Sequence, residues 1–140
     1  MQNKQPVSVL VVICTAGLEV LLLERADHPG YWQSVTGSRD GEETLVETAT
    51  REVREETGLE LDDLSLFGVY SGPELFYVYP NGDQIYNVII VYLARQTRGE
   101  IRLNDEHTEW RWFAAPDIPA DLSPPIRPII DAFKVSLLPS

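Results

Sequence analysis

The segment from residue 44 to residue 58 most constrains what this chain can fold into. Four apolar residues recur there at helical spacing: Leu45, Val46, Ala49 and Val53. Thr44 is a suitable N-cap, with Glu47 completing a capping box, and Gly58 is well placed to end the helix. We therefore expect an amphipathic helix over residues 44–57, and its apolar face requires a second layer of structure to cover it.

Strands are expected on both sides of this helix. Runs rich in Val, Leu, Ile and aromatic residues predict strands over 7–14, 19–24, 65–71, 74–79, 84–95 and 109–114. The first two are expected to pair as a hairpin around Ala16-Gly17, and Asn81-Gly82 is expected to turn the chain between later strands. Turn-forming residues predict a loop over 28–43, and apolar spacing predicts a short closing helix over 126–133. We expect residues 1–140 to form one α/β domain, a sandwich around a mixed sheet.

Three glutamates on the central helix converge on one patch. At 100° per residue, Glu52, Glu55 and Glu56 fall within about 100° of one another, beside the apolar stripe. Oxygen ligands of this kind favour Mg²⁺, with Mn²⁺ as a substitute, and such ions assist phosphoryl transfer to water. The alternative is a solvated helix face on which Arg51 pairs with Glu47 and Glu55.

The charge balance excludes several classes of partner. Twenty-two acidic and eleven basic residues give a net charge of −11, which disfavours binding to nucleic-acid polymers and to anionic membranes. A small triphosphate is compatible with this charge because acids recruit Mg²⁺ and Mg²⁺ recruits phosphate. The single cysteine, Cys14, excludes an internal disulfide and is expected to be a buried thiol. Without a recognisable targeting or membrane-spanning segment, the expected location is cytoplasmic.

The acidic helix and the loop before it resemble a known family. The pattern G-x5-E-x7-R-E-U-x-E-E-x-G-U, with U apolar, is matched at Gly37, Glu43, Arg51, Glu52, Val53, Glu55, Glu56, Gly58 and Leu59. This is the signature of the Nudix, or MutT-like, hydrolases. The resemblance implies an α/β/α sandwich with a central mixed sheet and a loop-helix-loop motif, and an enzyme that hydrolyses phosphoric anhydride bonds with divalent ions. One departure is that Gly41-Glu42-Glu43 stands where the family usually has Gly-Glu at positions 42–43.

The same resemblance assigns roles to individual residues. Glu52, Glu55 and Glu56 would be catalytic metal ligands, helped by the backbone carbonyl of Gly37, and Arg51 would pair with Glu43 to hold the loop against the helix.

Many Nudix enzymes also use a carboxylate from a late loop as general base. Glu106 is the preferred candidate for that role and Glu109 the reserve, while two solvated acids in a turn are the alternative. We expect His107 to hydrogen-bond within this turn without a catalytic role, and His28 to be a loop residue.

The stretch over residues 25–38 bears on the substrate. Its Tyr-Trp-Gln-Ser-Val-Thr-Gly-Ser sequence resembles the dihydroneopterin triphosphate, or dATP, pyrophosphohydrolases within the family. That likeness implies a nucleoside or pterin triphosphate as substrate, cleaved to the monophosphate and pyrophosphate. Dimers are common among similar proteins, so a homodimer is possible. The expected substrate-binding residues are Arg25, Trp32 and Gln33; Arg25 binds a phosphate or forms a surface ion pair.

Other interpretations of the chain stay open. Trp32, Tyr77 and Tyr86 could stack on a ring, although an aromatic residue in a strand is a core residue at least as often. The likeness to pyrophosphohydrolases of triphosphates fades after residue 60. A Nudix hydrolase of ADP-ribose or of a nucleotide sugar is therefore the alternative function, followed by a nucleotide-binding module without turnover.

Overall fold

A computed structural model describes residues 3–4, 7–72, 76–78, 82, 84–86, 88–123 and 126–136. The strands are β1 (Asn3–Lys4), β2 (Val7–Ile13), β3 (Glu19–Arg25), β4 (Trp32–Gln33), β5 (Val35–Ser38), β6 (Glu60–Leu61), β7 (Ser65–Tyr70), β8 (Phe76–Val78), β9 (Gln84–Tyr86), β10 (Val88–Ala94), β11 (Thr97–Arg98) and β12 (His107–Ala114). The helices are α1 (Leu45–Thr57), the 3-10 turn η2 (Ala115–Asp117) and α2 (Arg127–Ser136). Within these residues, no helix is both long and apolar enough to span a bilayer.

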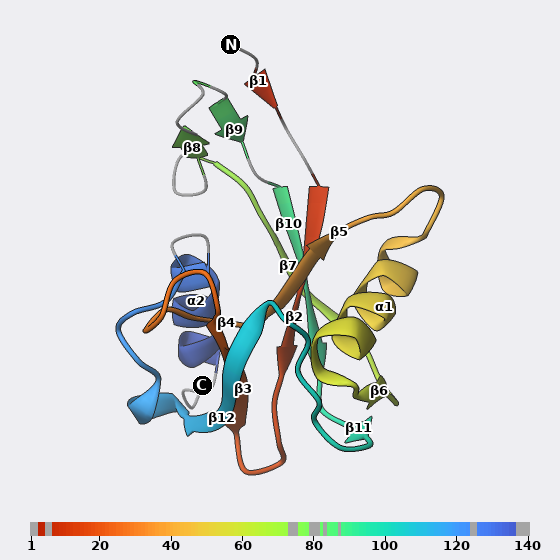
Figure 1. Ribbon diagram of the computed structural model, residues 1–140, viewed down its shortest axis with the longest axis vertical. Coiled ribbons are helices and arrows are strands. Elements are labelled where there is room, and N and C mark those ends of the chain that lie inside the picture. The colour runs from red at the N-terminus through yellow and green to blue at the C-terminus, as the bar shows by residue number, and fades with distance from the viewer. Residues whose placement is uncertain are drawn as a thin grey trace.

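Two sheets form the centre of the molecule, and α1 and α2 lie on opposite sides of them (Figure 1). The four-stranded sheet has the order β5-β2-β10-β7, in which β2 and β10 are parallel and the other pairs antiparallel. The three-stranded sheet has the order β12-β3-β4 and is antiparallel throughout. The predicted α/β sandwich with a central mixed sheet is therefore confirmed.

The predicted hairpin of the first two strands is wrong. Apart from one isolated bridge between Cys14 and Val20, β2 pairs with β5 and β10, whereas β3 pairs with β4 and β12. Both strands carry apolar side chains on both faces, so each strand is buried between two layers and pairs with other strands on either side. A short turn at Ala16-Gly17 passes the chain from one sheet to the other.

Side-chain alternation along these two strands supplies both cores. Val9, Val11, Leu21 and Leu23 pack with Ala49 and Val53 of α1 in one cluster. Leu10, Val12, Val20 and Leu22 pack with Ile129, Ile130 and Phe133 of α2 in the other. Cys14 belongs to this second cluster as a buried free thiol, as predicted, and burial raises its pKa.

The helix α1 has the predicted ends. The Thr44 hydroxyl accepts from the Glu47 amide at 3.1 Å, and the Glu47 carboxylate accepts from the Thr44 amide at 2.9 Å, which completes the capping box. Gly58 ends the helix at φ 77°, a left-handed conformation that glycine adopts without a steric cost. These local interactions fix which turn of α1 carries each glutamate.

Other boundaries differ from the predictions. The region 28–43 is not all loop, because it contains β4 and β5, whose pairing with β3 and β2 overrides its turn-rich composition. The strand predicted over 84–95 is two strands, β9 and β10, and β12 begins two residues earlier than expected. The side chains of Tyr77 and Tyr86, considered as stacking residues, lie outside the described part of the structure.

Candidate active site

The side chain of Glu56 is buried inside the fold. It lies in the last turn of α1 and is 1% exposed, and neither carboxylate oxygen has a hydrogen-bond partner among the described residues. Burial raises the pKa of Glu56 far above its usual range, and the nearby carboxylates of Glu52 and Glu106 raise it further. An ionised carboxylate without a partner is costly to bury, and a bound cation would offset that cost by stabilising the charged form.

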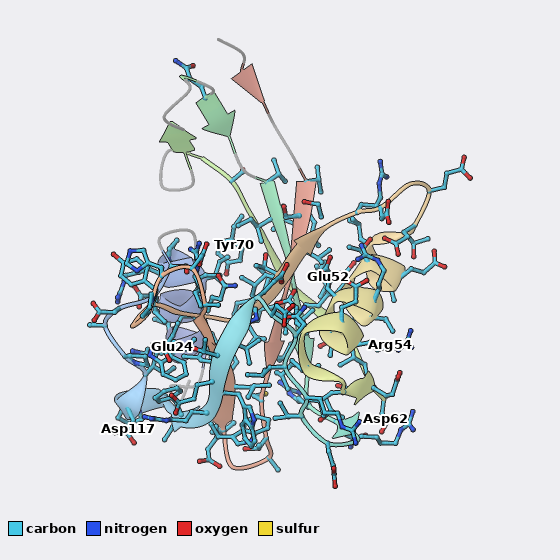
Figure 2. The ribbon with its side chains drawn as sticks, in the orientation of Figure 1. Glu24, Glu52, Arg54, Asp62, Tyr70 and Asp117 are labelled. Atoms are coloured by element: carbon cyan, nitrogen blue, oxygen red, sulfur yellow. The ribbon has the colours of Figure 1, made fainter. Side chains whose placement is uncertain are left out.

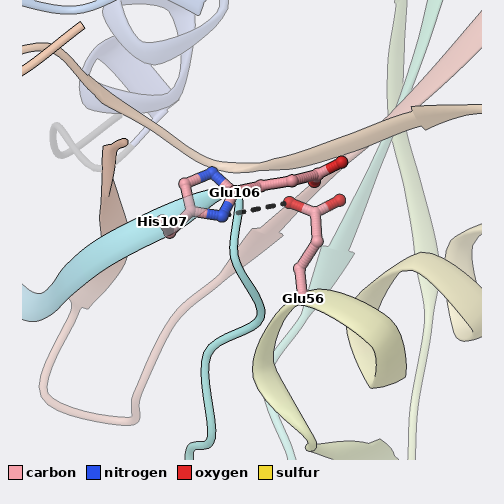
Figure 3. Close-up of side chains that lie close together, drawn as sticks. All are labelled: Glu56, Glu106 and His107. Atoms are coloured by element: carbon pink, nitrogen blue, oxygen red, sulfur yellow. Dashed lines mark ion pairs between the residues drawn. The ribbon is translucent and has the colours of Figure 1, made fainter. Parts of the chain in front are cut away.

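Acidic groups from separate segments surround this carboxylate. Glu106 comes from the turn before β12, and ligand atoms of Glu56, Glu106 and His107 all lie within 4.8 Å of one another (Figure 3). Glu52 lies one turn before Glu56 on the face of α1 toward the strands, while Arg54 lies on the outer side (Figure 2). A carboxylate-rich donor set with unsatisfied buried oxygens fits a hard divalent cation.

The strand β5 brings Gly37 against this cluster. A methyl group added at Gly37 would overlap the carboxylate of Glu52, so a larger residue here would displace the end of the Glu52 side chain. The strand that carries Gly37 is held in place by its antiparallel pairing with β2, in which Gly37 lies opposite Val9. The backbone expected to help hold a metal therefore lies beside the acidic face of α1.

Arg51 joins the loop before α1 to the middle of the helix. Its Nε and Nη2 donate to the two carboxylate oxygens of Glu43 at 2.7 and 3.0 Å, and Nη2 also donates to the Ser38 carbonyl at 3.0 Å. The Arg51 guanidinium lowers the pKa of Glu43 to about 2, with further hydrogen bonds from the Asp40 amide and the Thr48 hydroxyl. This geometry is the one expected for a pair that supports the site.

Glu55 lies apart from the buried cluster. Its side chain is 53% exposed and accepts from Arg51 Nη1, which also donates to Glu52 at 3.0 Å. The structure thus forms the Arg51–Glu55 pair of the solvated-face alternative, but not an Arg51–Glu47 pair, because Glu47 is used in the capping box. Glu52 and Glu56 are the two signature glutamates that face inward.

The two late carboxylates have different surroundings. Glu106 is exposed at the rim of the cluster, whereas the Glu109 carboxylate accepts from Arg111 at 2.7 and 3.0 Å on β12. Of the two candidates for a general base, Glu106 is therefore the one that lies next to Glu56.

His107 differs from expectation. Its side chain does not hydrogen-bond within the turn but is buried beside Glu56, with Nδ1 at 3.8 Å from Glu56 Oε1. Burial lowers the pKa of His107, and Arg25 lowers it further, so the ring is neutral near pH 7. The sequence carries no local signal for this position, which depends on the pairing of His107 with Arg25 where β12 meets β3.

Two cavities open next to the acidic cluster. One of about 410 Å³ is lined by Arg25, Ala26, Asp27, Gln33, Thr36, Asp105 and Glu106. The other, of about 150 Å³, is lined by Ser8, Arg25, Gln33, Thr36, Ile89, Ser123 and Ile126. Arg25, Gln33 and Thr36 line both, so the two cavities are adjacent parts of one cleft whose larger part reaches Glu106.

The expected substrate-binding residues have different positions relative to this cleft. Arg25 lines it while its guanidinium donates to the Asp27 carboxylate at 2.7 and 2.8 Å, and Gln33 lines it beside His107. Trp32 requires a correction: it is 9% exposed and belongs to the core, packed edge-on against Phe113 with Arg111 over its ring. Because both neighbours occupy its ring, Trp32 is a core residue and lines neither described cavity.

Comparison with known proteins identifies the family. The model of the NUDIX domain matches residues 4–133 of the chain. The chain belongs to the Nudix family. Nudix proteins of known structure share its fold: a MutT Nudix hydrolase from Burkholderia pseudomallei superposes with a TM-score of 0.77 at 30% identity, covering 91% of this chain and 97% of that one. The predicted family and the predicted class, a hydrolase acting on phosphoric anhydride bonds, are confirmed.

Among curated Nudix relatives, two carry the same name in different organisms. The dihydroneopterin triphosphate diphosphatase of Haemophilus influenzae is 36% identical over 124 residues, which cover 82% of this chain and 78% of that protein. The dihydroneopterin triphosphate diphosphatase of Escherichia coli K12 is 49% identical over 59 residues, covering 41% of this chain and 39% of that protein. The second match therefore spans well under half of either Nudix protein.

Proposed function

We propose that this Nudix protein is a Mg²⁺-dependent pyrophosphohydrolase of a nucleoside triphosphate or of dihydroneopterin triphosphate, with Mn²⁺ as a substitute ion. The observation that carries the proposal is the buried, unpartnered carboxylate of Glu56, grouped with Glu52 and Glu106 where a cleft lined by Arg25 ends. This arrangement supplies oxygen ligands at one point and a cationic side chain beside it, as a metal-bound polyphosphate requires.

Each residue then has a chemical task. When bound, a divalent cation would supply positive charge to the phosphate oxygens and make water more acidic. Glu52 and Glu56, which face inward, would hold the cation with the Gly37 carbonyl, and Glu55 would be the weaker ligand because it is exposed and paired with Arg51. Arg51 and Glu43 would keep the loop against α1.

On the substrate side, Glu106 would take the proton of the attacking water as general base, since it both lines the cleft and lies next to Glu56. Arg25 would bind a phosphate oxygen, and its bonds to Asp27 and Ser123 fix the guanidinium in the cleft wall. Water adds to one phosphorus of the anhydride and the bond to the bridging oxygen breaks, which yields the monophosphate and pyrophosphate.

The substrate class is supported by the sequence of residues 25–38 and, in agreement with it, by the name shared by the Haemophilus influenzae and Escherichia coli relatives. The cleft supports a phosphate-bearing substrate because the cationic Arg25 and the carboxylate of Glu106 both line it. The cytoplasmic location and the homodimer remain predictions from the sequence.

The test is a substrate panel with product identification. Dihydroneopterin triphosphate, dATP, other nucleoside triphosphates, ADP-ribose and nucleotide sugars are each incubated with Mg²⁺, and pyrophosphate is measured separately from monophosphate. We expect pyrophosphate release from a triphosphate, its loss with a chelator, and its recovery with added Mg²⁺ or Mn²⁺. Turnover confined to ADP-ribose or nucleotide sugars would establish the alternative hydrolase, and binding without any turnover would establish a nucleotide-binding module.

A further inference from the structure

A series of polar contacts connects the cleft to the buried Glu56. Arg25 Nη1 donates to Ser123 Oγ at 3.3 Å, and Ser123 Oγ donates to Gln33 Oε1 at 3.2 Å. Gln33 Nε2 lies 2.9 Å from His107 Nε2, and His107 Nδ1 lies 3.8 Å from Glu56 Oε1 (Figure 3). Ser123, His107 and Glu56 are 3%, 5% and 1% exposed, so the end of the series at His107 and Glu56 is shielded from bulk water, whereas Arg25 and Gln33 line the cleft.

The chemistry of Arg25 sets the direction of the whole series. A guanidinium has only donors, so the Ser123 hydroxyl accepts from Arg25 and directs its own proton to Gln33 Oε1. The amide nitrogen of Gln33 then faces His107, and because an amide N–H donates, His107 Nε2 accepts. The proton of the neutral imidazole is therefore on Nδ1, the nitrogen that faces Glu56.

His107 Nδ1 and both oxygens of Glu56 have no hydrogen-bond partner within the described part of the chain. At 3.8 Å the two groups are just beyond hydrogen-bond distance, and a small closing movement of either side chain would satisfy the buried donor and the buried acceptor together. We propose that His107 is a positioning residue: its Nδ1–H, oriented by Arg25, Ser123 and Gln33, holds the carboxylate of Glu56 in the orientation needed for metal binding. The importance of this orientation for turnover rests on the function proposed above.

The proposal makes a claim about the metal-free protein that does not depend on activity. Nitrogen-15 NMR of the ring should show a pyrrole-type Nδ1 and a pyridine-type Nε2 for His107. The chain has only one other histidine, His28, which is exposed and stacked on Tyr31. The variant His28→Asn therefore assigns the spectrum and also serves as the matched control.

Two substitutions separate the two ring nitrogens. Asn places an amide near the position of Nδ1 and keeps a donor for Glu56, whereas Gln reaches the position of Nε2 and keeps only the contact to Gln33. In calorimetric titrations with Mg²⁺, we expect His107→Asn to stay within a few-fold of the wild type. His107→Gln should bind about 10–100-fold more weakly, the range typical of losing a partner that orients a metal ligand. His28→Asn should bind like the wild type.

The outcomes separate this proposal from the proposed function. The positioning role would be overturned by a pyridine-type Nδ1. It would also be overturned if His107→Asn and His107→Gln lost Mg²⁺ affinity equally, and His107 would then contribute only to packing. Absence of triphosphate hydrolysis by the wild type would instead overturn the proposed function, while the ring tautomer and the difference between the two variants would still stand. Circular dichroism of both variants ensures that only folded proteins are compared.

Discussion

The guanidinium of Arg51 and the carboxylate of Glu43 face each other with two contacts, Nε–Oε2 at 2.7 Å and Nη2–Oε1 at 3.0 Å. This bidentate pair joins the loop before α1 to the helix itself, eight residues later in the chain. The same guanidinium donates to Glu52 and Glu55 through Nη1. A single arginine thus holds the loop and limits the positions of two signature carboxylates.

This pair makes stability depend on pH in a defined window. The pKa of Glu43 is about 2, below its usual value of 4.5, so its contribution is fully present above pH 4.5 and is lost as pH falls toward 2. Urea unfolding at several pH values should show wild type more stable than Glu43→Gln at pH 6, with the difference shrinking steadily below pH 4.5. A difference that is independent of pH would contradict a role for the charged carboxylate.

Replacing Gly37 with alanine should weaken metal binding. The added methyl overlaps the Glu52 carboxylate, which must move away from its place beside β5. We expect Mg²⁺ affinity to fall at least about 10-fold in calorimetric titrations. Gly17→Ala is the matched control, because the nearest atom to its methyl is Thr15 Oγ1 at an ordinary 3.6 Å. Equal affinities in the two variants would show that the close approach at Gly37 is unimportant.

The two adjacent glutamates of the signature should contribute unequally. Glu56→Gln replaces a carboxylate ligand of the proposed cation site by an amide, and we expect kcat to fall more than about 100-fold while the thermal midpoint is unchanged or raised, because a buried acid without a hydrogen-bond partner is replaced by an isostere that does not ionise. Glu55→Gln should lose less than about 10-fold, since this side chain is 53% exposed and paired with Arg51. Full activity of Glu56→Gln would refute the metal-ligand assignment.

The general base should be Glu106 and not Glu109. Glu106→Gln removes the carboxylate that lines the cleft next to Glu56, so kcat should fall about 10²–10⁴-fold with little change in KM. Glu109→Gln only breaks a surface pair with Arg111 and should retain near wild-type kcat. The reverse order of the two variants in steady-state kinetics would assign the role to Glu109.

Removal of Arg25 should affect substrate binding more than stability. Arg25 lines both parts of the cleft, so Arg25→Ala is expected to raise KM for a triphosphate about 10-fold or more, the loss of one charge-assisted contact to phosphate. Arg98→Ala, which removes an exposed arginine paired with Asp62, is the control and should leave KM unchanged. An unchanged KM in Arg25→Ala would place the phosphates elsewhere.

The sequence by itself determined what depends on neighbours along the chain. Thr44, Glu47 and Gly58 set the ends of α1 through hydrogen bonds and a left-handed residue within a few positions of one another. The spacing of Glu52 and Glu56 then puts their carboxylates one turn apart on one face, whatever the helix packs against. The match of the signature to a family also follows from the sequence alone.

Only the tertiary structure decided what depends on partners distant in sequence. The register of β12 against β3 brings Glu106 and His107 to Glu56, about fifty residues away, and the separation of β2 and β3 into two sheets overrides the short turn between them. Trp32 became a core residue through Phe113 and Arg111. Strand pairing and burial depend on residues that are distant along the chain. The alternation of side chains along a strand repeats every two residues, so local composition does not specify which strand pairs with which.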